Sequence, residues 1–233
     1  SSDLHTFCHA VPGAWHVMGV MLSAGGSLRW YRDVLCQEEI ARGEKEGRDP
    51  YEYITEAAGT VPPGSEGLVF LPYLTGERTP HKDPHAKGAF IGLSLRHTKA
   101  HMARAVLEGV AFGMRDSLEI IREMKIPVDE VRTSGGGARS DLWRQILADT
   151  GRAPMLTINV DEGPAYGAAI LASVGAGIHE SVEKACDSII REVDRLDPNE
   201  STAKAYEPWF YEYQAAYQAL APAFRRMGGL LEG

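Results

Sequence analysis

The chain has 233 residues, 44% of them hydrophobic, and this length predicts one large domain or two small ones with a hydrophobic core. A formal net charge of −8 argues against nucleic-acid binding, and no run of about 18 apolar residues could span a membrane. The three cysteines are widely spaced and form no Cys-x-x-Cys pair, which favours reduced thiols in a cytoplasmic protein.

The amino-terminal segment contains an expected strand and a glycine-rich helix start. The three histidines within residues 5–16 have no acidic partner beside them, so we interpret them as structural rather than metal-binding. Residues 15–21 predict a strand. Residues 22–33 predict a glycine turn and then a helix, which Ser23 or Ser27 would cap. Such a turn brings backbone N–H groups close to a ligand, although a plain tight turn needs the same residues.

The next segments alternate between polar and apolar character. Residues 37–50 are charged and broken by glycine, which predicts a solvated helix end or a loop, and a short helix follows at 51–58. The apolar run at 68–71 predicts a buried strand. Residues 72–84 contain three prolines and predict a long ordered loop, whose charged side chains either contact substrate or pin the loop by hydrogen bonds. These side chains are Glu77, Arg78, His81 and Asp83.

Residues 101–124 show the clearest helical periodicity in the chain. Small residues recur on its apolar face at every fourth position: Ala105, Gly109, Gly113 and Ser117. The helix expected after residue 163 has a matching set: Ala165, Ala169 and Ala172. Because each interior glycine costs a helix about 1 kcal/mol, we predict that close approach of these two helices, nearly backbone to backbone, explains them.

Three consecutive glycines at positions 135–137 join an expected strand, which enters from Val131, to an expected helix. Ser140 stands where it would cap that helix, which continues to about residue 151. A strand, a glycine turn and a helix place backbone N–H groups and a helix N-terminus beside an anion or a polar edge. The same run also fits a plain tight turn, so the motif alone leaves both interpretations open.

The remaining segments complete an alternating pattern. Residues 155–160 predict a strand, Pro164 begins a helix that continues to about residue 174, and residues 180–193 are polar and predicted to be helical. A last helix is expected over 202–227, with an aromatic stripe that we assign to the core. Strands that alternate with helices in this way predict an α/β fold with a largely parallel or mixed sheet.

A dinucleotide-binding oxidoreductase domain is one alternative for the glycine turn. Gly135-x-Gly137-x-x-Ser140 nearly fits the dinucleotide fingerprint, and Asp161 closes the next strand as a ribose-binding carboxylate would. Two observations speak against this alternative. The third position is serine instead of glycine or alanine, and at least two expected strands precede a turn that should follow the first strand.

Several motifs resemble the FGGY family of carbohydrate kinases, and together they cover nearly the whole chain. They are GAFIGL at 88–93, HMARAVLE at 101–108, GGGA at 135–138 and EGPAYGAA at 162–169. The segments at 7–18 and 72–80 are most similar to the xylulokinase members of that family. The resemblance implies that residues 1–233 form the second, C-terminal and nucleotide-binding domain of an actin-like, ribonuclease H-like kinase, with a mixed sheet flanked by helices.

The resemblance also implies a reaction. Such kinases transfer the γ-phosphoryl group of ATP, with Mg²⁺, to a sugar hydroxyl in a cleft between two domains. The expected substrate is the pentulose D-xylulose, which would be phosphorylated to D-xylulose 5-phosphate. The alternative substrates are another sugar or a polyol. The sugar-binding N-terminal domain and the first strands of this domain are expected to lie upstream, because the chain lacks an initiator Met and begins as though within a longer protein.

The residues that correspond to nucleotide contacts in the family are Gly25, Arg29, Gly136, Gly137, Ala138 and Asp141. Gly137 would lie against the adenosine, whereas Asp141 and Arg29 differ in type from their counterparts in glycerol kinase. We assign no catalytic residue, since the catalytic aspartate and the phosphate loop are expected upstream. A non-catalytic binding or scaffolding module stays open as an alternative, and a homodimer is possible.

Overall fold

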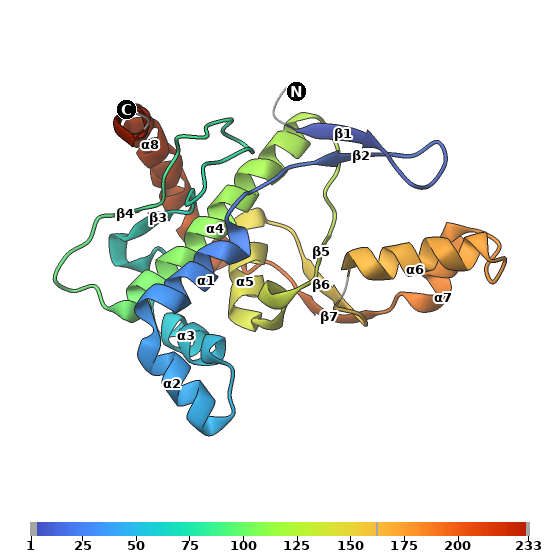
Figure 1. Cartoon of the computed structure of the whole chain (residues 1–233), viewed down its shortest axis with the longest axis horizontal. Helices are drawn as coiled ribbons and strands as arrows, with labels where there is room; N and C mark the ends of the chain where they lie inside the picture. Colours follow the sequence, from blue (N-terminus) through green and yellow to red (C-terminus); the bar gives the residue numbers. More distant parts are fainter. Residues whose placement is uncertain (1–3, 162, 232–233) are drawn as a thin grey trace.

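The computed structural model describes residues 4–161 and 163–231, and it shows an α/β chain with three short sheets arranged around one central helix (Figure 1). That helix, α4 (Lys99–Glu123), confirms the helix predicted over 101–124. Residues 103–113 are buried without interruption, because elements from both halves of the chain pack against it. Small residues in a helix that is buried on every side let neighbouring elements pack close to it, which an exposed helix does not require.

The amino-terminal residues form a hairpin that extends from the body of the molecule (Figure 1). Strands β1 (His5–Cys8) and β2 (Trp15–Met18) pair in antiparallel orientation, which confirms the first half of the strand expected at 15–21. The large side chains of Phe7 and Trp15 are exposed at 44% and 67%. The hairpin therefore presents apolar surface that nothing in the described chain covers.

Helix α1 (Ala24–Leu35) corrects the expected glycine turn at its start. Gly25 and Gly26 lie inside the first turn of the helix rather than before it. Ser23 occupies the N-cap position, but its hydroxyl does not cap the helix backbone and instead bonds the hydroxyl of Thr75 at 2.8 Å. The sequence could not show this, because Thr75 lies on a loop that is distant along the chain.

Two short helices follow, α2 (Gln37–Glu46) and α3 (Pro50–Gly59). The first shows that residues 37–50 are mostly helical, where the sequence allowed a helix end or a loop. The second is the predicted short helix, and it begins where the carboxylate of Asp49 accepts a hydrogen bond from the Tyr51 amide at 3.0 Å. Proline at the first helical position and an aspartate cap explain this start.

Strand β3 (Val69–Leu71) is the buried strand expected from residues 68–71, and it pairs in antiparallel orientation with β4 (Ala89–Ile91). Every residue of β3 is buried. The rings of Phe70 and Phe90 lie opposite each other with 4.6 Å between their centroids. Burial on both faces accounts for the continuous apolar run in the sequence.

The loop between β3 and β4, residues 72–88, is ordered by hydrogen bonds, as predicted. Glu77 Oε1 accepts from a backbone amide of the β2–α1 connection at 3.0 Å, and Asp83 Oδ2 accepts from the Tyr217 hydroxyl at 2.9 Å. Both carboxylates are buried, whereas Arg78 is exposed. For Glu77 and Asp83 the structure therefore favours the pinning role over substrate contact.

A three-stranded mixed sheet lies on the other side of α4. Strand β5 (Val131–Thr133) pairs parallel with β6 (Met155–Ile158), and β6 pairs antiparallel with β7 (Glu192–Leu196). The prediction of helix over 180–193 is right for α7 (Val182–Ile189) but misses β7. Most residues of β7 are exposed and charged, so only its pairing with β6, distant in sequence, makes it a strand.

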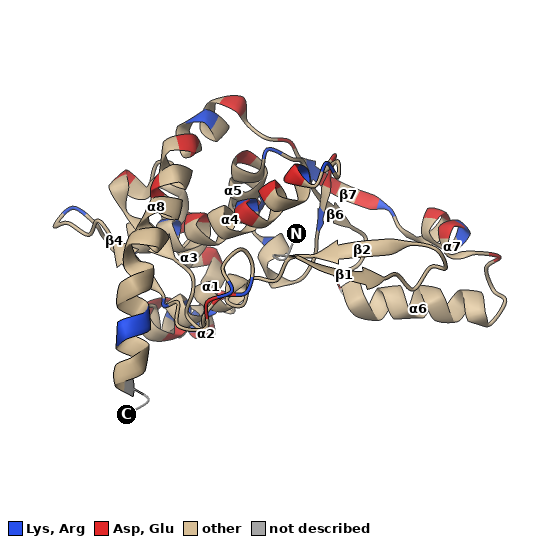
Figure 2. Cartoon of the chain, turned by 90° about the horizontal axis from the view of Figure 1, so that it is seen from above, with Lys and Arg blue, Asp and Glu red and all other residues tan. Residues whose placement is uncertain are grey.

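Helix α6 (Gly163–Gly175) overturns the predicted contact between two sets of small residues. It packs mainly against α7, its only buried residue among those described is Ile170, and the alanines that were expected to meet α4 are exposed. It contains no charged residue (Figure 2). Gly109 of α4 instead faces β3, where an added Cβ would lie 2.2 Å from the carbonyl oxygen of Phe70. Small residues did indicate close approach, but the partner was a strand.

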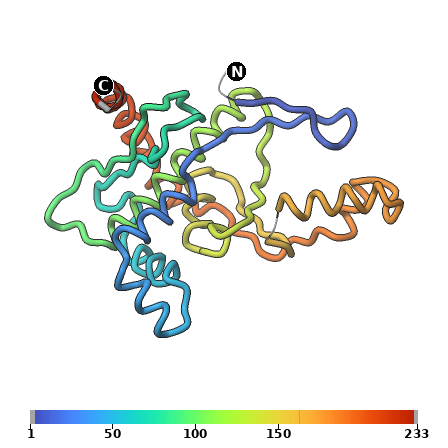
Figure 3. Tube along the Cα trace, viewed as in Figure 1, coloured from blue at the N-terminus to red at the C-terminus, as the bar shows by residue number. Residues whose placement is uncertain are grey.

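The last helix, α8 (Glu200–Leu231), crosses the body and then extends beyond it (Figure 3). The prediction that its aromatic stripe belongs to the core is confirmed for Tyr206, Phe210, Tyr213 and Tyr217, which are buried. The ring of His81 stacks on that of Tyr217 with 3.6 Å between centroids, which fixes the 72–88 loop against α8. Neither α8 nor any other described helix is long and apolar enough to cross a membrane.

A buried polar network joins α4 to its neighbours. The carboxylate of Glu108 accepts from the Gly64 amide at 3.0 Å and from the Ser65 hydroxyl, in η1 (Ser65–Gly67), at 2.8 Å. Arg104 donates to it at 2.7 Å and Tyr206 at 3.0 Å. Burial raises the pKa of Glu108, whereas Arg104 and the other donors lower it. These donors are what makes a buried carboxylate tolerable here.

Gly109→Ala is expected to lower the free energy of unfolding by about 3 kcal/mol, because the new methyl group would overlap the Phe70 carbonyl. Gly167→Ala is the matched control, since it adds the same methyl group inside α6 where no atom lies within 4 Å. The control should gain about 0.5–1 kcal/mol from better helix propensity. Urea unfolding of both variants measures this, and equal effects would contradict the packing of α4 on β3.

Asp116→Asn is expected to stabilise the chain at high pH. Burial raises the pKa of Asp116 from 3.8 to about 7. Between these two pH values the Asp116 carboxyl group is protonated in the folded state and ionised in the unfolded chain. The free energy of unfolding therefore falls by about 1.4 kcal/mol per pH unit as pH rises through this range. In urea titrations the variant should exceed the parent in stability by a clearly larger margin at pH 8 than at pH 4.5, where the expected difference is about 1 kcal/mol.

Asp129→Asn is the control for this pH dependence, because Asp129 is an exposed carboxylate. It should change the free energy of unfolding by less than about 0.5 kcal/mol at both pH values. A stabilisation by Asp116→Asn that is the same at pH 4.5 and pH 8 would show that Asp116 is not protonated in the folded state.

Candidate nucleotide site

The glycine turn predicted at 135–137 is present between a strand and a helix. After β5 the chain turns at the first glycine, whose φ of +81° favours that residue type, and passes through η2 (Gly136–Arg139) into α5 (Asp141–Gly151). The Ser140 hydroxyl accepts a hydrogen bond from the Trp143 amide at 3.3 Å. The predicted cap and the predicted end of this helix are both confirmed.

One side of the turn exposes its backbone. A Cβ added at Gly135 or Gly136 would meet no atom within 4 Å. The amides of Gly136 and Gly137 donate to no acceptor in the part of the chain that the structure describes. These open N–H groups lie in the turn that leads through η2 into α5, and they can donate to a polar or anionic edge of a ligand.

Gly137 has a second role that the sequence did not reveal. A Cβ at this position would lie 3.0 Å from the indole ring of Trp143, which is buried and donates from Nε1 to the Leu107 carbonyl oxygen at 3.2 Å. The turn thus packs on a tryptophan that is itself anchored to α4. Glycine is needed here for packing beneath the turn, whatever binds above it.

Asp141, the first residue of α5, is held by a residue that sequence reasoning missed. Its Oδ1 accepts from Arg144 Nη2 at 2.7 Å, and the same nitrogen donates to Asp194 Oδ2 at 2.6 Å. The spacing of Asp141 and Arg144, three residues apart on a helix, was a signal that could have identified the pair. Asp194 could not have been found, because it lies on β7, which the sequence did not predict.

The other candidate residues lie on the first two turns of α1. Gly25 is exposed, and an added Cβ there would meet no atom within 4 Å. Arg29, four residues later, is also exposed, and its side chain makes no hydrogen bond or ion pair within residues 4–161 and 163–231. Both positions are accessible to a ligand.

The candidate residues therefore form two groups on different helices. The first group comprises Gly136, Gly137, Ala138 and Asp141, and the second comprises Gly25 and Arg29. Helices α1 and α5 both pack against α4, but no hydrogen bond or ion pair joins the two groups in the described chain. The first group is nearly contiguous in sequence, at the turn before α5 and its first residue, whereas the second lies on α1.

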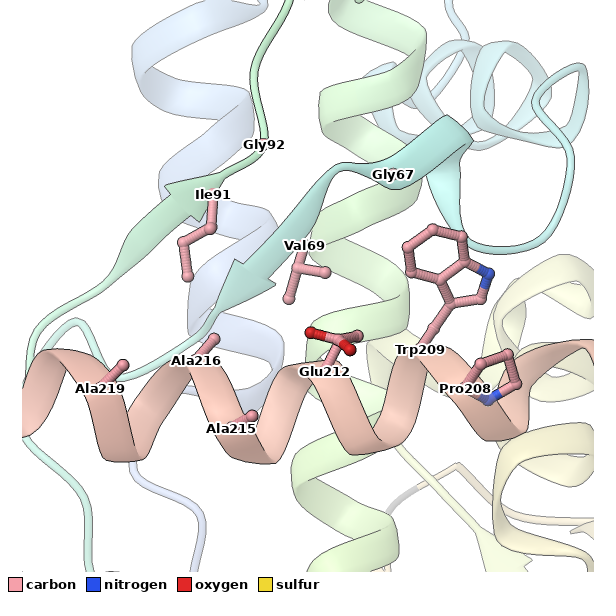
Figure 4. Close-up of a pocket in the computed structure, with 10 residues that line it drawn as sticks. All are labelled: Gly67, Val69, Ile91, Gly92, Pro208, Trp209, Glu212, Ala215, Ala216 and Ala219. Atoms are coloured by element: carbon pink, nitrogen blue, oxygen red, sulfur yellow. The ribbon is translucent and has the colours of Figure 1, made fainter.

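A groove elsewhere on the molecule contains none of these residues. It has a volume of about 620 Å³ and lies between α8 and the β3–β4 pair (Figure 4). Trp209 and Glu212 of α8 face Val69 and Ile91 across it. The grooves beside α2 and between α3 and α5 also exclude the six candidates. The candidate site therefore lies outside these three grooves, on an open platform formed by the turn before α5.

The described residues offer no metal site. No group of three or more His, Cys, Asp or Glu side chains among them could hold an ion. The thiols are free, with Cys36 buried and Cys8 exposed. The described side chains therefore form no preformed cluster for the expected Mg²⁺, and we derive no step through it.

Comparison with known proteins agrees with this architecture. Residues 2–176 match the C-terminal domain of the FGGY family of carbohydrate kinases. The chain belongs to this family. The resemblance expected from the sequence motifs is thereby confirmed, and so is the fold of the second domain of an actin-like sugar kinase.

Individual relatives share this domain. The xylulose kinase of Staphylococcus epidermidis is 38% identical over 217 residues, which cover 93% of this chain and 42% of the relative. The gluconokinase of Bacillus subtilis is 36% identical over 228 residues, or 97% of this chain and 42% of the relative. The crystal structure of xylulose kinase from Rhodospirillum rubrum aligns with a TM-score of 0.83 at 32% identity, over 97% of this chain and 44% of that one. The chain thus spans less than half the length of these FGGY kinases.

Family membership also decides against the dinucleotide alternative. Asp161, the expected ribose-binding carboxylate, lies on the surface and pairs with Arg139 of η2 at 3.2 Å. Both side chains are exposed, at 66% and 71%. The partial match to the dinucleotide fingerprint arose because this chain also has a glycine turn between a strand and a helix.

Gly137→Ala is expected to displace the Trp143 indole and to lower the free energy of unfolding by about 1–2 kcal/mol, because the contact below the turn is already tight. Tryptophan fluorescence and near-UV circular dichroism measure the displacement. Gly136→Ala is the matched control, since the same methyl group would point into open space. Equal spectral changes in the two variants would contradict the packing of Gly137 on Trp143.

Proposed function

We propose that this chain is the nucleotide-binding domain of a two-domain sugar kinase that phosphorylates D-xylulose to D-xylulose 5-phosphate with ATP. The observation that carries the proposal is the open glycine turn at the start of α5 in a chain of the FGGY family. The relatives named xylulose kinase support the choice of sugar. An enzyme that uses ATP for sugar metabolism would act in the cytoplasm.

ATP fits the exposed surface of the turn. Adenosine needs a flat surface and a few polar partners, which the glycine backbone and the Asp141 carboxylate offer. Arg29, exposed and without a partner in the described chain, has the charge to approach the phosphates. In this proposal Gly136, Gly137 and Ala138 lie against the nucleoside, and Gly25 lets the ligand approach α1.

The chemical step requires residues that we place in the rest of the enzyme. A kinase needs a carboxylate that orients and deprotonates the sugar hydroxyl, and it needs donors on the transferred phosphoryl group. Glu77, Asp83 and Asp116 are buried in the core, so none of them is offered to a sugar. We propose that the upstream domain supplies the base, and that Mg²⁺ is held there and by the phosphates.

Unpaired surfaces support the proposal that upstream strands and a second domain complete this one. The exposed hairpin of β1 and β2 and the uncharged, exposed helix α6 are both unusual on an isolated domain (Figures 1 and 2). An open platform is also what one wall of a cleft between two domains should look like. The relatives are long enough to supply the other wall, since the chain covers 42% of their length.

The sugar is tested by ADP release from the complete protein with Mg-ATP and D-xylulose, D-gluconate or glycerol. D-Xylulose should give the highest kcat/KM. A preference for D-gluconate would shift the proposal to the gluconokinase relatives and would leave the ATP site in place. Absence of ADP release with every sugar, in a folded protein, would favour the non-catalytic module instead.

Trp143 offers a test of the nucleotide site that does not depend on turnover. Its indole lies beneath Gly137, so ATP on the platform should change its fluorescence. Mutating the other three tryptophans to phenylalanine would isolate this signal. A size-exclusion measurement on the same protein addresses the possible homodimer, which remains a prediction.

A further inference from the structure

Arg144 is a buried cation whose side chain has two hydrogen-bond partners in the described chain, Asp141 and Asp194. Its side chain is 5% exposed, whereas those of Asp141 and Asp194 are 83% and 47% exposed. Both carboxylates accept from the same nitrogen, Nη2. The Nε and Nη1 atoms of Arg144 are buried and have no hydrogen-bond partner in the part of the chain that the structure describes. All hydrogen bonds of this guanidinium therefore go to two surface aspartates.

Stability is a poor explanation for this arrangement. A buried guanidinium with two unpartnered N–H groups pays a large desolvation cost, and replacing buried ion pairs by apolar side chains is often neutral or stabilising. Burial lowers the pKa of Arg144, but the hydrogen bonds to Asp141 and Asp194 outweigh it and leave the pKa above its usual value. The guanidinium is therefore charged, at a position where its charge adds little to the stability of the core.

Orientation of Asp141 is the better explanation. An exposed aspartate at the start of a helix would otherwise sample several rotamers, and a ligand that bound it would have to fix one of them. Arg144 engages Oδ1, while Oδ2 has no hydrogen-bond partner in the described chain. A carboxylate held by one oxygen presents the other as an acceptor in one direction.

We propose that Arg144 is a positioning residue for nucleotide recognition, which holds Asp141 so that its free oxygen accepts a hydrogen bond from a donor group of the nucleoside. This inference rests on the proposed function, since it assumes that the nucleoside lies on the turn before α5. The contact between Arg144 and Asp194 ties α5 to β7 and has no part in recognition. Arg144 thus acts only through Asp141.

A double-mutant cycle in the complete kinase tests this role. Asp141→Ala and Arg144→Met should each raise the KM for ATP about tenfold, as expected for a lost charge-assisted hydrogen bond, and should leave kcat and the sugar KM within about twofold. The double variant should be no worse than Asp141→Ala alone, because Arg144 has nothing left to position. Effects on KM that multiply in the double variant would overturn the proposal.

Asp194→Asn is the matched control, because it weakens the other ion pair of the same guanidinium. Any decrease in its melting temperature should be no larger than that of Arg144→Met. Its KM for ATP should stay within about twofold of the parent value. A rise in KM equal to that of Arg144→Met would show that Arg144 acts by tying α5 to β7, which contradicts the positioning role.

Arg144→Lys keeps the positive charge and provides a second test if Arg144→Met does not fold. Far-UV circular dichroism shows whether each variant is folded. A lysine amine can reach one oxygen but lacks the planar guanidinium, so its KM for ATP should lie between those of the parent and of Asp141→Ala. If both Arg144 variants fail to fold, Arg144 is a stabilising residue and the proposal is wrong. An inactive parent enzyme would instead refute the proposed function, so the two failures are distinguishable.

Discussion

Burial of the Glu108 carboxylate in the centre of α4 is the constraint on which the rest of this domain depends. A charge that is 2% exposed is tolerated only when donors surround it, and here they come from η1, from α4 and from α8. Satisfying one carboxylate therefore fixes where the segment before β3 and the last helix cross the central helix. The close packing of Gly109 on β3 is possible because these crossings are set.

The glycine turn derives its position from the same core. Trp143 is anchored to the Leu107 carbonyl oxygen, next to Glu108 in the chain, and Gly137 lies directly above its indole. The lower side of the turn is thus part of the packed interior, while the amides of Gly136 and Gly137 on the upper side have no partner within residues 4–161 and 163–231. Packing on one side and open backbone on the other is the geometry on which the proposed nucleotide contact depends.

Most of the candidate residues of this domain are exposed. They lie on the open platform before α5 and on α1, and none of them lines the three grooves described above. Apolar surface on the amino-terminal hairpin and on α6 is uncovered in the same molecule. We propose that a second domain faces this surface, and the proposed chemistry depends on the residues that it supplies.

The sequence by itself determined the elements whose cause is local. Periodicity predicted α4, Ser140 predicted the cap of α5, the aromatic stripe predicted the buried face of α8, and the motifs predicted the family. Tertiary structure decided everything that depends on which surfaces meet. Gly109 met a strand instead of α6, β7 formed only by pairing with β6, and Arg144 reached Asp194 on that strand. Helix and cap signals act within a few residues, whereas partners are chosen by packing across the whole chain.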